Sequence, residues 1–289
     1  MQHHQPHDLA AILDIKAIAH NFSNAAKSYD AHACFQQEAA LRLTDRLDWF
    51  KCTPNRILDI GSGTGLLTAL LKKRYPKAQI VGLDLAIGMT RYAESKFKPK
   101  FWAPKHYHFV CGNAHQLPLR PHQFDLVVSN CALQWCQPLS VFKEIKKAIK
   151  PNGLFLFTTL GPDTLYELKN SFRGIDNYEH VHPFVDMHDI GDLLLNAGFN
   201  DPVMDAERLT LTYPNIKDLC LELKHTGATN IHQARSSGLM SRSKWQQLKQ
   251  QYDKFLTTDK QYPATFEIIY GHAFHPVGIT TPILTQCEK

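Results

Sequence analysis

The chain has 289 residues, 44% of them hydrophobic, and its 32 basic and 27 acidic residues give a net charge of +5. That length holds one large domain or two small ones, and the apolar content is typical of a globular protein. No apolar run approaches the roughly 18 residues of a membrane span. The basic residues are dispersed among acidic ones, which argues against a nucleic-acid-binding face.

The N-terminal and cysteine patterns favour a cytoplasmic protein. The first twenty residues lack a charged start, a long apolar stretch and a cleavage site, so we expect no signal peptide. Seven scattered cysteines without a C-x-x-C pair favour reduced thiols over a disulfide framework. The 16 histidines include no H-x-x-x-H or H-E-x-x-H frame with a supporting carboxylate, so we also expect no metal site.

The first regular elements are predicted to be helices within residues 8–50, where apolar residues recur three and four positions apart. The next stretch, RILDIGSGTGLLTALLKKRYPKAQIVGLDLA at residues 56–86, predicts a strand, a glycine turn, a helix and a second strand. Such a βαβ unit can hold a ligand where the turn meets the helix N-terminus. The dinucleotide fingerprint needs a glycine at the sixth position of the turn, where this chain has Leu66, so NAD is not expected.

The spacing D-x-G-x-G-x-G of Asp59, Gly61, Gly63 and Gly65 resembles motif I of the class I S-adenosylmethionine-dependent methyltransferases. Glycines allow a ligand to approach the backbone closely, and a helix N-terminus favours a carboxylate such as that of methionine. Asp84 follows Gly61 by 23 residues, at the end of the second strand, where a carboxylate can accept from both ribose hydroxyls.

The rest of the chain continues the alternation of strands and helices, which predicts an α/β, doubly wound seven-stranded sheet. An amphipathic helix is expected in residues 141–153, stopped by Pro151 and Gly153, and another in residues 189–199, stopped by Gly198. Five further strands are expected in residues 107–112, 124–130, 154–159, 208–213 and 265–274.

Two stretches, residues 161–187 and 213–262, do not belong to a minimal alternation, and the second contains two helical patterns. We expect both to be insertions near the carboxyl edge of the sheet that form a substrate lid. Residues 1–289 would then be one domain, with a helical cap (8–50), a cofactor-binding core (51–160), the two insertions and a last strand (263–276).

Four later segments narrow the resemblance from superfamily to family. The segments FDLVVSNCALQWCQPL, TTLGPDTLYELKNSF, LKHTGATN and TFEIIYGHAF resemble BioC, the malonyl-[acyl-carrier protein] O-methyltransferases of biotin synthesis. The N-terminal FSNAAKSYDAHACFQQEAALRL is similar to the leading segment of that family, so the resemblance covers nearly the whole chain.

The resemblance implies that S-adenosylmethionine is the methyl donor, that S-adenosylhomocysteine is the product, and that malonyl-carrier protein or malonyl-CoA is the acceptor. Two positions depart from the family pattern. Asn113 stands where many relatives have Asp, so its amide oxygen would accept from the adenine amino group, and Cys131 replaces an aliphatic residue. The residues expected to bind the cofactor are Asp59, Gly61, Gly63, Gly65, Asp84, Leu85, Asn113, Ala114 and Asn130, with Tyr29 and Gln36 closing over it.

Methyl transfer to an ionised carboxylate needs no general base, so no catalytic acid or base is expected; the reaction needs an aligned nucleophile and an active site without water. Arg235 and Lys224, within or just after the LKHTGATN segment, are candidates for holding the malonyl carboxylate, and Tyr29 for positioning it. Trp135 is expected in the wall of the substrate entrance, whereas Met89 and the leucines of residues 66–71 are expected in the core.

Other functions remain open. The mitochondrial arginine hydroxylase that assists complex I assembly is similar in the C-terminal stretch, but it carries a His-Trp pair where this chain has Gln134 and Trp135. A different small-molecule methyltransferase, or a methyltransferase fold retained as an assembly subunit, is also compatible with the pattern. The intact glycine motif argues against a cofactor site that has lost its function.

Overall fold

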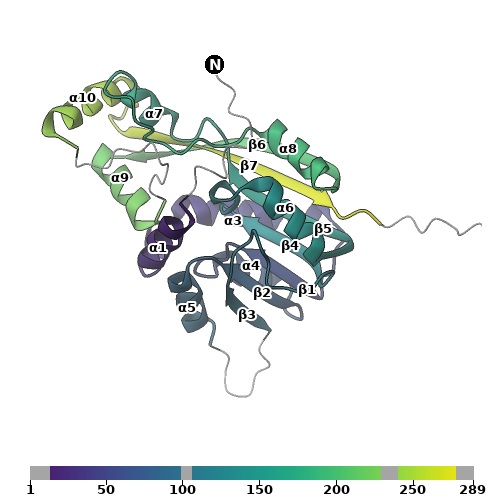
Figure 1. Ribbon diagram of the computed structural model, residues 1–289. Coiled ribbons are helices and arrows are strands. Elements are labelled where there is room, and N and C mark those ends of the chain that lie inside the picture. Colours follow the sequence, from purple (N-terminus) through teal and green to yellow (C-terminus); the bar gives the residue numbers. More distant parts are fainter. Residues whose placement is uncertain (1–13, 99–105, 229–239, 278–289) are drawn as a thin grey trace, which may run out of the picture.

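The computed structural model describes residues 14–98, 106–228 and 240–277. Within them, seven strands form one sheet in the order β3-β2-β1-β4-β5-β7-β6 (Figure 1). Strands β1 to β5 run parallel, and β7 runs antiparallel to its neighbours β5 and β6. The expected doubly wound, seven-stranded α/β sheet is confirmed. The strands are β1 (Arg56–Ile60), β2 (Gln79–Asp84), β3 (Tyr107–Cys111), β4 (Phe124–Asn130), β5 (Ile149–Leu160), β6 (Asn200–Tyr213) and β7 (Tyr262–Phe274).

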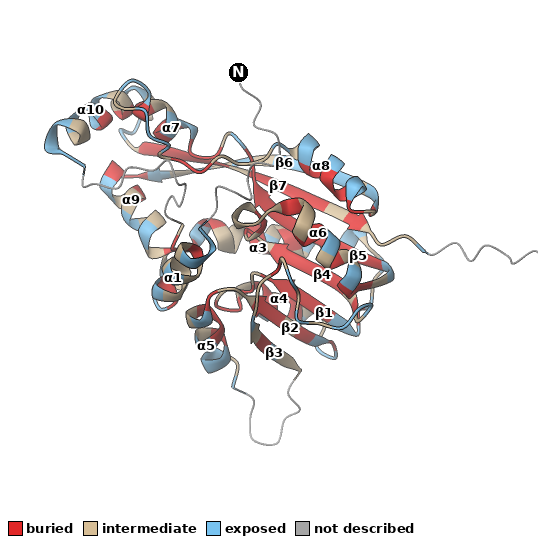
Figure 2. Cartoon of the chain, viewed as in Figure 1, coloured by how far each residue is buried: buried red, intermediate tan, exposed pale blue. Residues whose placement is uncertain are grey.

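Helices cover both faces of the sheet. One hydrophobic cluster joins α3 and α4 to the strands, and a second cluster joins α6 and α8 to the opposite face. The central strands are buried along most of their length (Figure 2). The helices are α1 (Ile15–Ala25), α2 (Tyr29–His32), α3 (Cys34–Arg46), η2 (Leu47–Trp49), α4 (Leu66–Arg74), α5 (Ile87–Lys96), η3 (Leu133–Trp135), α6 (Pro138–Ala148), α7 (Tyr166–Phe172), α8 (Met187–Asn196), α9 (Ile216–His225), α10 (Arg242–Tyr252) and η4 (Asp253–Phe255). In this part of the chain no helix has both the length and the apolarity needed to cross a bilayer.

Several boundaries differ from the sequence prediction. Helix α6 ends at Ala148, before the expected stop at Pro151, because Ile149 is fully buried and already pairs with Phe124 in the parallel ladder. Strand β6 begins at Asn200 rather than near Arg208, and its polar, mostly unburied sequence hides the extended pairing with β7. The helix α5 was not predicted, although its residue Met89 is buried, as expected. Of the leucines in residues 66–71, two are buried and two are partly buried.

The segments outside the minimal alternation lie at one end of the sheet. Helix α7 belongs to residues 161–187, and α9 and α10 belong to residues 213–262. All three helices gather around the outer ends of β6 and β7 (Figure 1). Their proposed role as a lid stays a prediction.

The strand order reverses at β1. Strands β2 and β3 lie on one side of β1, whereas the next strand, β4, pairs with β1 on its other side. Loops that follow the two strands therefore diverge and leave a crevice at their carboxyl ends. The glycine turn and the segment after Asn130 both lie there.

Candidate active site

The glycine turn between β1 and α4 has three residues in the left-handed region. Gly61, Gly63 and Gly65 have φ values of +69°, +54° and +85°, which side chains other than glycine rarely adopt. A Cβ on Gly61 would lie 2.1 Å from the Cβ of Ala132, in the loop after β4. A Cβ on Gly63 would meet no atom within 4 Å, so the backbone at Gly63 borders open space and a ligand can approach it.

The carboxylate of Asp84 is held rigidly beside this turn. Its Oδ2 accepts from the N–H of Gly63 at 2.8 Å, and its Oδ1 accepts from the N–H of Ala86 at 2.8 Å. Burial raises the pKa of Asp84 to about 6, and the two backbone hydrogen bonds oppose that rise. A carboxylate has about four acceptor positions, so each oxygen keeps one for a ligand.

The side chain of Asn113, just after β3, is fixed through His115. The N–H of Gln137 donates to His115 Nε2 at 2.9 Å, which places the imidazole proton on Nδ1. Asn113 Oδ1 then accepts from that Nδ1 at 2.8 Å and from the backbone N–H of His115 at 2.9 Å. The oxygen that was expected to accept from adenine is thus already occupied, and the amide NH₂ is the group of Asn113 left to face a ligand. Burial lowers the pKa of His115, which keeps its ring neutral.

These residues line a first cavity of about 100 Å³. Eight of the expected residues line it: Tyr29, Gly61, Gly63, Asp84, Leu85, Asn113, Ala114 and Asn130. Helix α1 contributes three further lining residues that the sequence did not suggest: Ile15, Ile18 and Phe22. Their helical spacing indicated an amphipathic helix, but not which part of the molecule it covers.

The remaining expected residues lie elsewhere. Asp59 is buried below the turn, where it accepts from Thr68 Oγ1 at 2.6 Å, and burial raises its pKa to about 7. Gly65 faces Phe97, and Gln36 lines a second cavity rather than the first. Lys224 is exposed and lines neither cavity, and Arg235 lies outside the described residues.

The N-terminal cap is attached to the core through α5 and the glycine turn. Helix α1 crosses α5 so closely that a Cβ on Gly88 would lie 2.4 Å from the carbonyl oxygen of Ser23. Asp30 accepts from Thr64 in the glycine turn and pairs with Lys96 of α5 at 2.6 Å. The cap therefore closes one side of the first cavity, and it places Tyr29 against that cavity.

A second cavity of about 270 Å³ lies beside the first and is mostly apolar. Four residues line both cavities: Phe22, Tyr29, Cys131 and Trp135. Trp135 packs edge-on against Phe22 at 5.6 Å and stacks on His182 at 5.6 Å; that it forms a wall of the substrate entrance stays a prediction. The helices α7, α9 and α10 and the strand β7 supply some of the other lining residues, and the loops beside these elements supply many of the rest.

Ionisable groups in the second cavity are few. Among the described lining residues there is no lysine or arginine, and the polar groups include His180 and Glu222. His180 pairs with Asp176 at 2.7 Å, and Lys244 and His180 together hold the pKa of Asp176 at about 2. Burial raises the pKa of Glu222. Among the described residues, the cavity therefore offers a ligand mainly apolar walls, together with a few polar groups such as the hydroxyl of Tyr29.

Comparison with known proteins gives the family. Residues 58–157 match the model of a methyltransferase domain family. A malonyl-[acyl-carrier protein] O-methyltransferase from Gallionella capsiferriformans is 44% identical over 92% of this chain and 92% of that protein. The protein of the same name from Legionella pneumophila is 41% identical over 89% of this chain and 89% of that protein.

Solved structures agree on the fold. A putative methyltransferase from Bacillus halodurans superposes with a TM-score of 0.59 at 18% identity, covering 83% of this chain and all of that one. A putative methyltransferase from Haloferax volcanii, in a complex with the activator Trm112, superposes with a TM-score of 0.56 at 13% identity, covering 88% of this chain and 97% of that chain. The sheet is therefore that of the class I methyltransferases, and by its sequence the chain belongs to the malonyl-[acyl-carrier protein] O-methyltransferase family.

Proposed function

We propose that this chain transfers the methyl group of S-adenosylmethionine to the free carboxylate of a malonyl thioester, which yields the malonyl methyl ester and S-adenosylhomocysteine. One observation carries the proposal: a cavity built by the glycine turn and Asp84 adjoins an apolar cavity, and both share the side chain of Tyr29. Relatives that are 37–44% identical and named malonyl-[acyl-carrier protein] O-methyltransferase support this acceptor.

The residues of the first cavity fit the donor. The unused acceptor positions of Asp84 suit the two ribose hydroxyls, and the open space at Gly63 suits close approach of the methionine part. Asn113 and Ala114 would border the adenine ring, and the apolar face of α1 would cover it from solvent. Bound S-adenosylmethionine supplies an electrophilic methyl group on a sulfonium.

Tyr29, which lines both cavities, would orient the acceptor. Burial raises the pKa of Tyr29 well above its usual value, so its hydroxyl stays protonated and can donate a hydrogen bond. A neutral donor restrains a carboxylate without neutralising it, and the oxygen therefore remains nucleophilic. The Tyr29→Phe variant should lower kcat for methyl transfer at least several-fold and leave S-adenosylhomocysteine binding nearly unchanged; an unchanged kcat would remove the hydroxyl from the mechanism.

The thiols near the donor are kept unreactive. Cys131 and Cys136 line the first cavity, and burial raises the pKa of both to about 12. The thiolate is the nucleophilic form of cysteine, so very little of it exists at neutral pH. The methyl group is therefore kept for the acceptor and is not lost to the protein.

The thioester carrier is the finer part of the proposal. We favour malonyl-carrier protein over malonyl-CoA, because the relatives that are 41–44% identical are named for that acceptor. The net charge of +5 is compatible with docking of an acidic carrier protein. Arg235, which lies outside the described residues, is proposed to pair with the malonyl carboxylate, and Lys224, whose side chain is exposed, is the second candidate for that role. We place the reaction in the cytoplasm, because seven scattered cysteines without a C-x-x-C pair favour reduced thiols.

A panel of acceptors tests the proposal. Purified chain is incubated with radiolabelled S-adenosylmethionine and, separately, malonyl-carrier protein, malonyl-CoA, quinone precursors and an arginine peptide. We expect the highest kcat/KM with malonyl-carrier protein, and we expect Arg235→Ala to reduce it while S-adenosylhomocysteine binding stays intact. Preferential labelling of the quinone precursors or of the arginine peptide would overturn the proposal, and a parental rate in Arg235→Ala would reduce Arg235 to a surface charge.

A further inference from the structure

The segment after β5, residues 161–167, lies beside the first half of β7, where β5 no longer pairs with it. Strand β5 pairs with β7 only from Ile268 to Phe274. Before Ile268, the segment 161–167 takes over that side of β7. The N–H of Gly161 donates to the carbonyl oxygen of Glu267 at 2.9 Å, and the N–H of Leu165 donates to that of Thr265 at 2.6 Å. The segment is therefore anchored through the backbone at two points.

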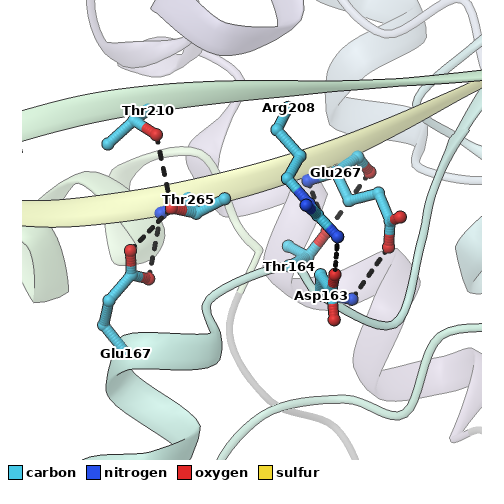
Figure 3. Close-up of polar contacts among 7 residues, drawn as sticks. All are labelled: Asp163, Thr164, Glu167, Arg208, Thr210, Thr265 and Glu267. Carbon is cyan, nitrogen blue, oxygen red and sulfur yellow. Dashed lines mark hydrogen bonds and ion pairs between the residues drawn. The ribbon is translucent and has the colours of Figure 1, made fainter.

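A buried carboxylate adds a third anchor. Glu167, at the start of α7, is only 1% exposed. Its Oε2 accepts from the N–H of Thr265 at 3.0 Å, and its Oε1 accepts from Thr265 Oγ1 at 2.6 Å (Figure 3). Thr265 Oγ1 also lies 3.3 Å from Thr210 Oγ1 on β6. Burial of a carboxylate is costly, and hydrogen bonds from both donors of one threonine offset part of that cost.

Glu267, two residues after Thr265 on β7, makes similar contacts with the same segment. Its backbone N–H donates to Thr164 Oγ1 at 3.1 Å, and its Oε2 accepts from the N–H of Asp163 at 2.8 Å. Figure 3 shows Glu167 of α7 reaching Thr265 on β7, and Glu267 of β7 reaching back to Asp163 in the segment. Arg208 also pairs with Asp163, but both side chains are largely exposed, so this pair adds little.

The anchored segment carries a strained residue into the second cavity. Leu165 has a φ of +55°, which is unfavourable for a residue with a Cβ and persists only where the surroundings enforce it. Thr164, Leu165 and Leu168 line the second cavity and do not line the first. The hydrogen bonds of Glu167 and Glu267 thus fix one wall of the cavity in which we place the acceptor.

We propose that Glu167 and Thr265 are positioning residues that limit the length of the acyl group. This inference rests on the proposed function. The acceptor carboxylate must reach the junction of the two cavities, and the thioester must lead out to the carrier. With the carboxylate and the thioester of the acyl group both fixed, the chain of a longer acyl group must bend toward the wall formed by Thr164, Leu165 and Leu168. A wall that cannot move therefore disfavours a succinyl thioester relative to a malonyl one.

Kinetics with two acceptors test the inference. The parental chain, Glu167→Gln, Thr265→Val and Thr265→Ser are compared on malonyl- and succinyl-carrier protein. Loss of the anchor should raise the KM for the malonyl acceptor about fivefold or more and leave kcat within about twofold. The ratio of succinyl to malonyl kcat/KM should rise at least fivefold in Glu167→Gln and Thr265→Val. Thr265→Ser keeps the hydroxyl and should retain the parental ratio.

Calorimetry with S-adenosylhomocysteine shows whether each variant is folded, and Asp192→Asn, an exposed carboxylate on α8, is the control that should change nothing. An unchanged succinyl-to-malonyl ratio in variants that bind S-adenosylhomocysteine normally would overturn the inference, as would a Thr265→Ser variant that behaves like Thr265→Val. Failure of the parental chain to methylate either acceptor would instead contradict the proposed function.

Discussion

Replacing Asp84 by alanine should weaken binding of S-adenosylhomocysteine by about 1–3 kcal/mol, or about 5- to 150-fold in Kd. The magnitude follows from the acceptor positions of the carboxylate. Two of about four positions are used by the N–H groups of Gly63 and Ala86, at 2.8 Å each, which leaves two for the ribose hydroxyls. The truncation removes the charged acceptor of the ligand and also leaves the N–H groups of Gly63 and Ala86 without this partner.

The assay is isothermal titration at pH 8, well above the pKa of about 6, so that the parental Asp84 is ionised. Asp192→Ala, which removes an exposed carboxylate on α8, is the control and should bind as the parental chain does. Circular dichroism of both variants excludes unfolding as the cause. A parental Kd in Asp84→Ala would remove this carboxylate from the cofactor site and refute the reasoning.

The other predictions concern pH, a buried charge and the cap. Affinity for S-adenosylhomocysteine should be level above pH 6 and fall below it, because only ionised Asp84 offers both acceptor positions; the same affinity at pH 5 would contradict this. Asp59→Asn should raise the free energy of unfolding at pH 8 by about 1–3 kcal/mol. The folded pKa of about 7 exceeds the unfolded value, so the parental chain should gain stability relative to Asp59→Asn as pH falls from 8 to 5, and thermal unfolding of both chains measures this difference. Gly88→Val should separate α1 from α5 and so raise the Kd of S-adenosylhomocysteine. A parental Kd in this variant would exclude α1 from the cofactor site.

The parts of the fold that are encoded locally could be predicted from the sequence. The turn glycines and Asp84 belong to one short βαβ unit, so their spacing along the chain also describes their arrangement in space. The central strands are apolar on both faces, because helices cover both sides of a parallel sheet. The glycine spacing and the apolar strand pattern can both be recognised without knowing which distant residues lie nearby.

The rest of the site depends on contacts between distant segments. The second cavity combines residues from Phe22 in α1 to Phe266 in β7, and no local pattern states that these meet. Glu167 and Thr265 are separated by 98 positions, so the sequence presents an ordinary helical glutamate rather than an anchor. The extent of β6 was also hidden, because this edge strand pairs with only one neighbour and carries polar residues along much of its length.

The most direct test identifies the product formed on malonyl-carrier protein. Purified chain is incubated with methyl-labelled S-adenosylmethionine and malonyl-carrier protein, and the isolated carrier is then treated with mild base. Our account predicts label on the acyl group that base releases as methanol, as expected of a methyl ester, and predicts little label with Asp84→Ala. Label that is stable to base, or a carrier that remains unlabelled, would contradict the claim that this chain methylates the malonyl carboxylate.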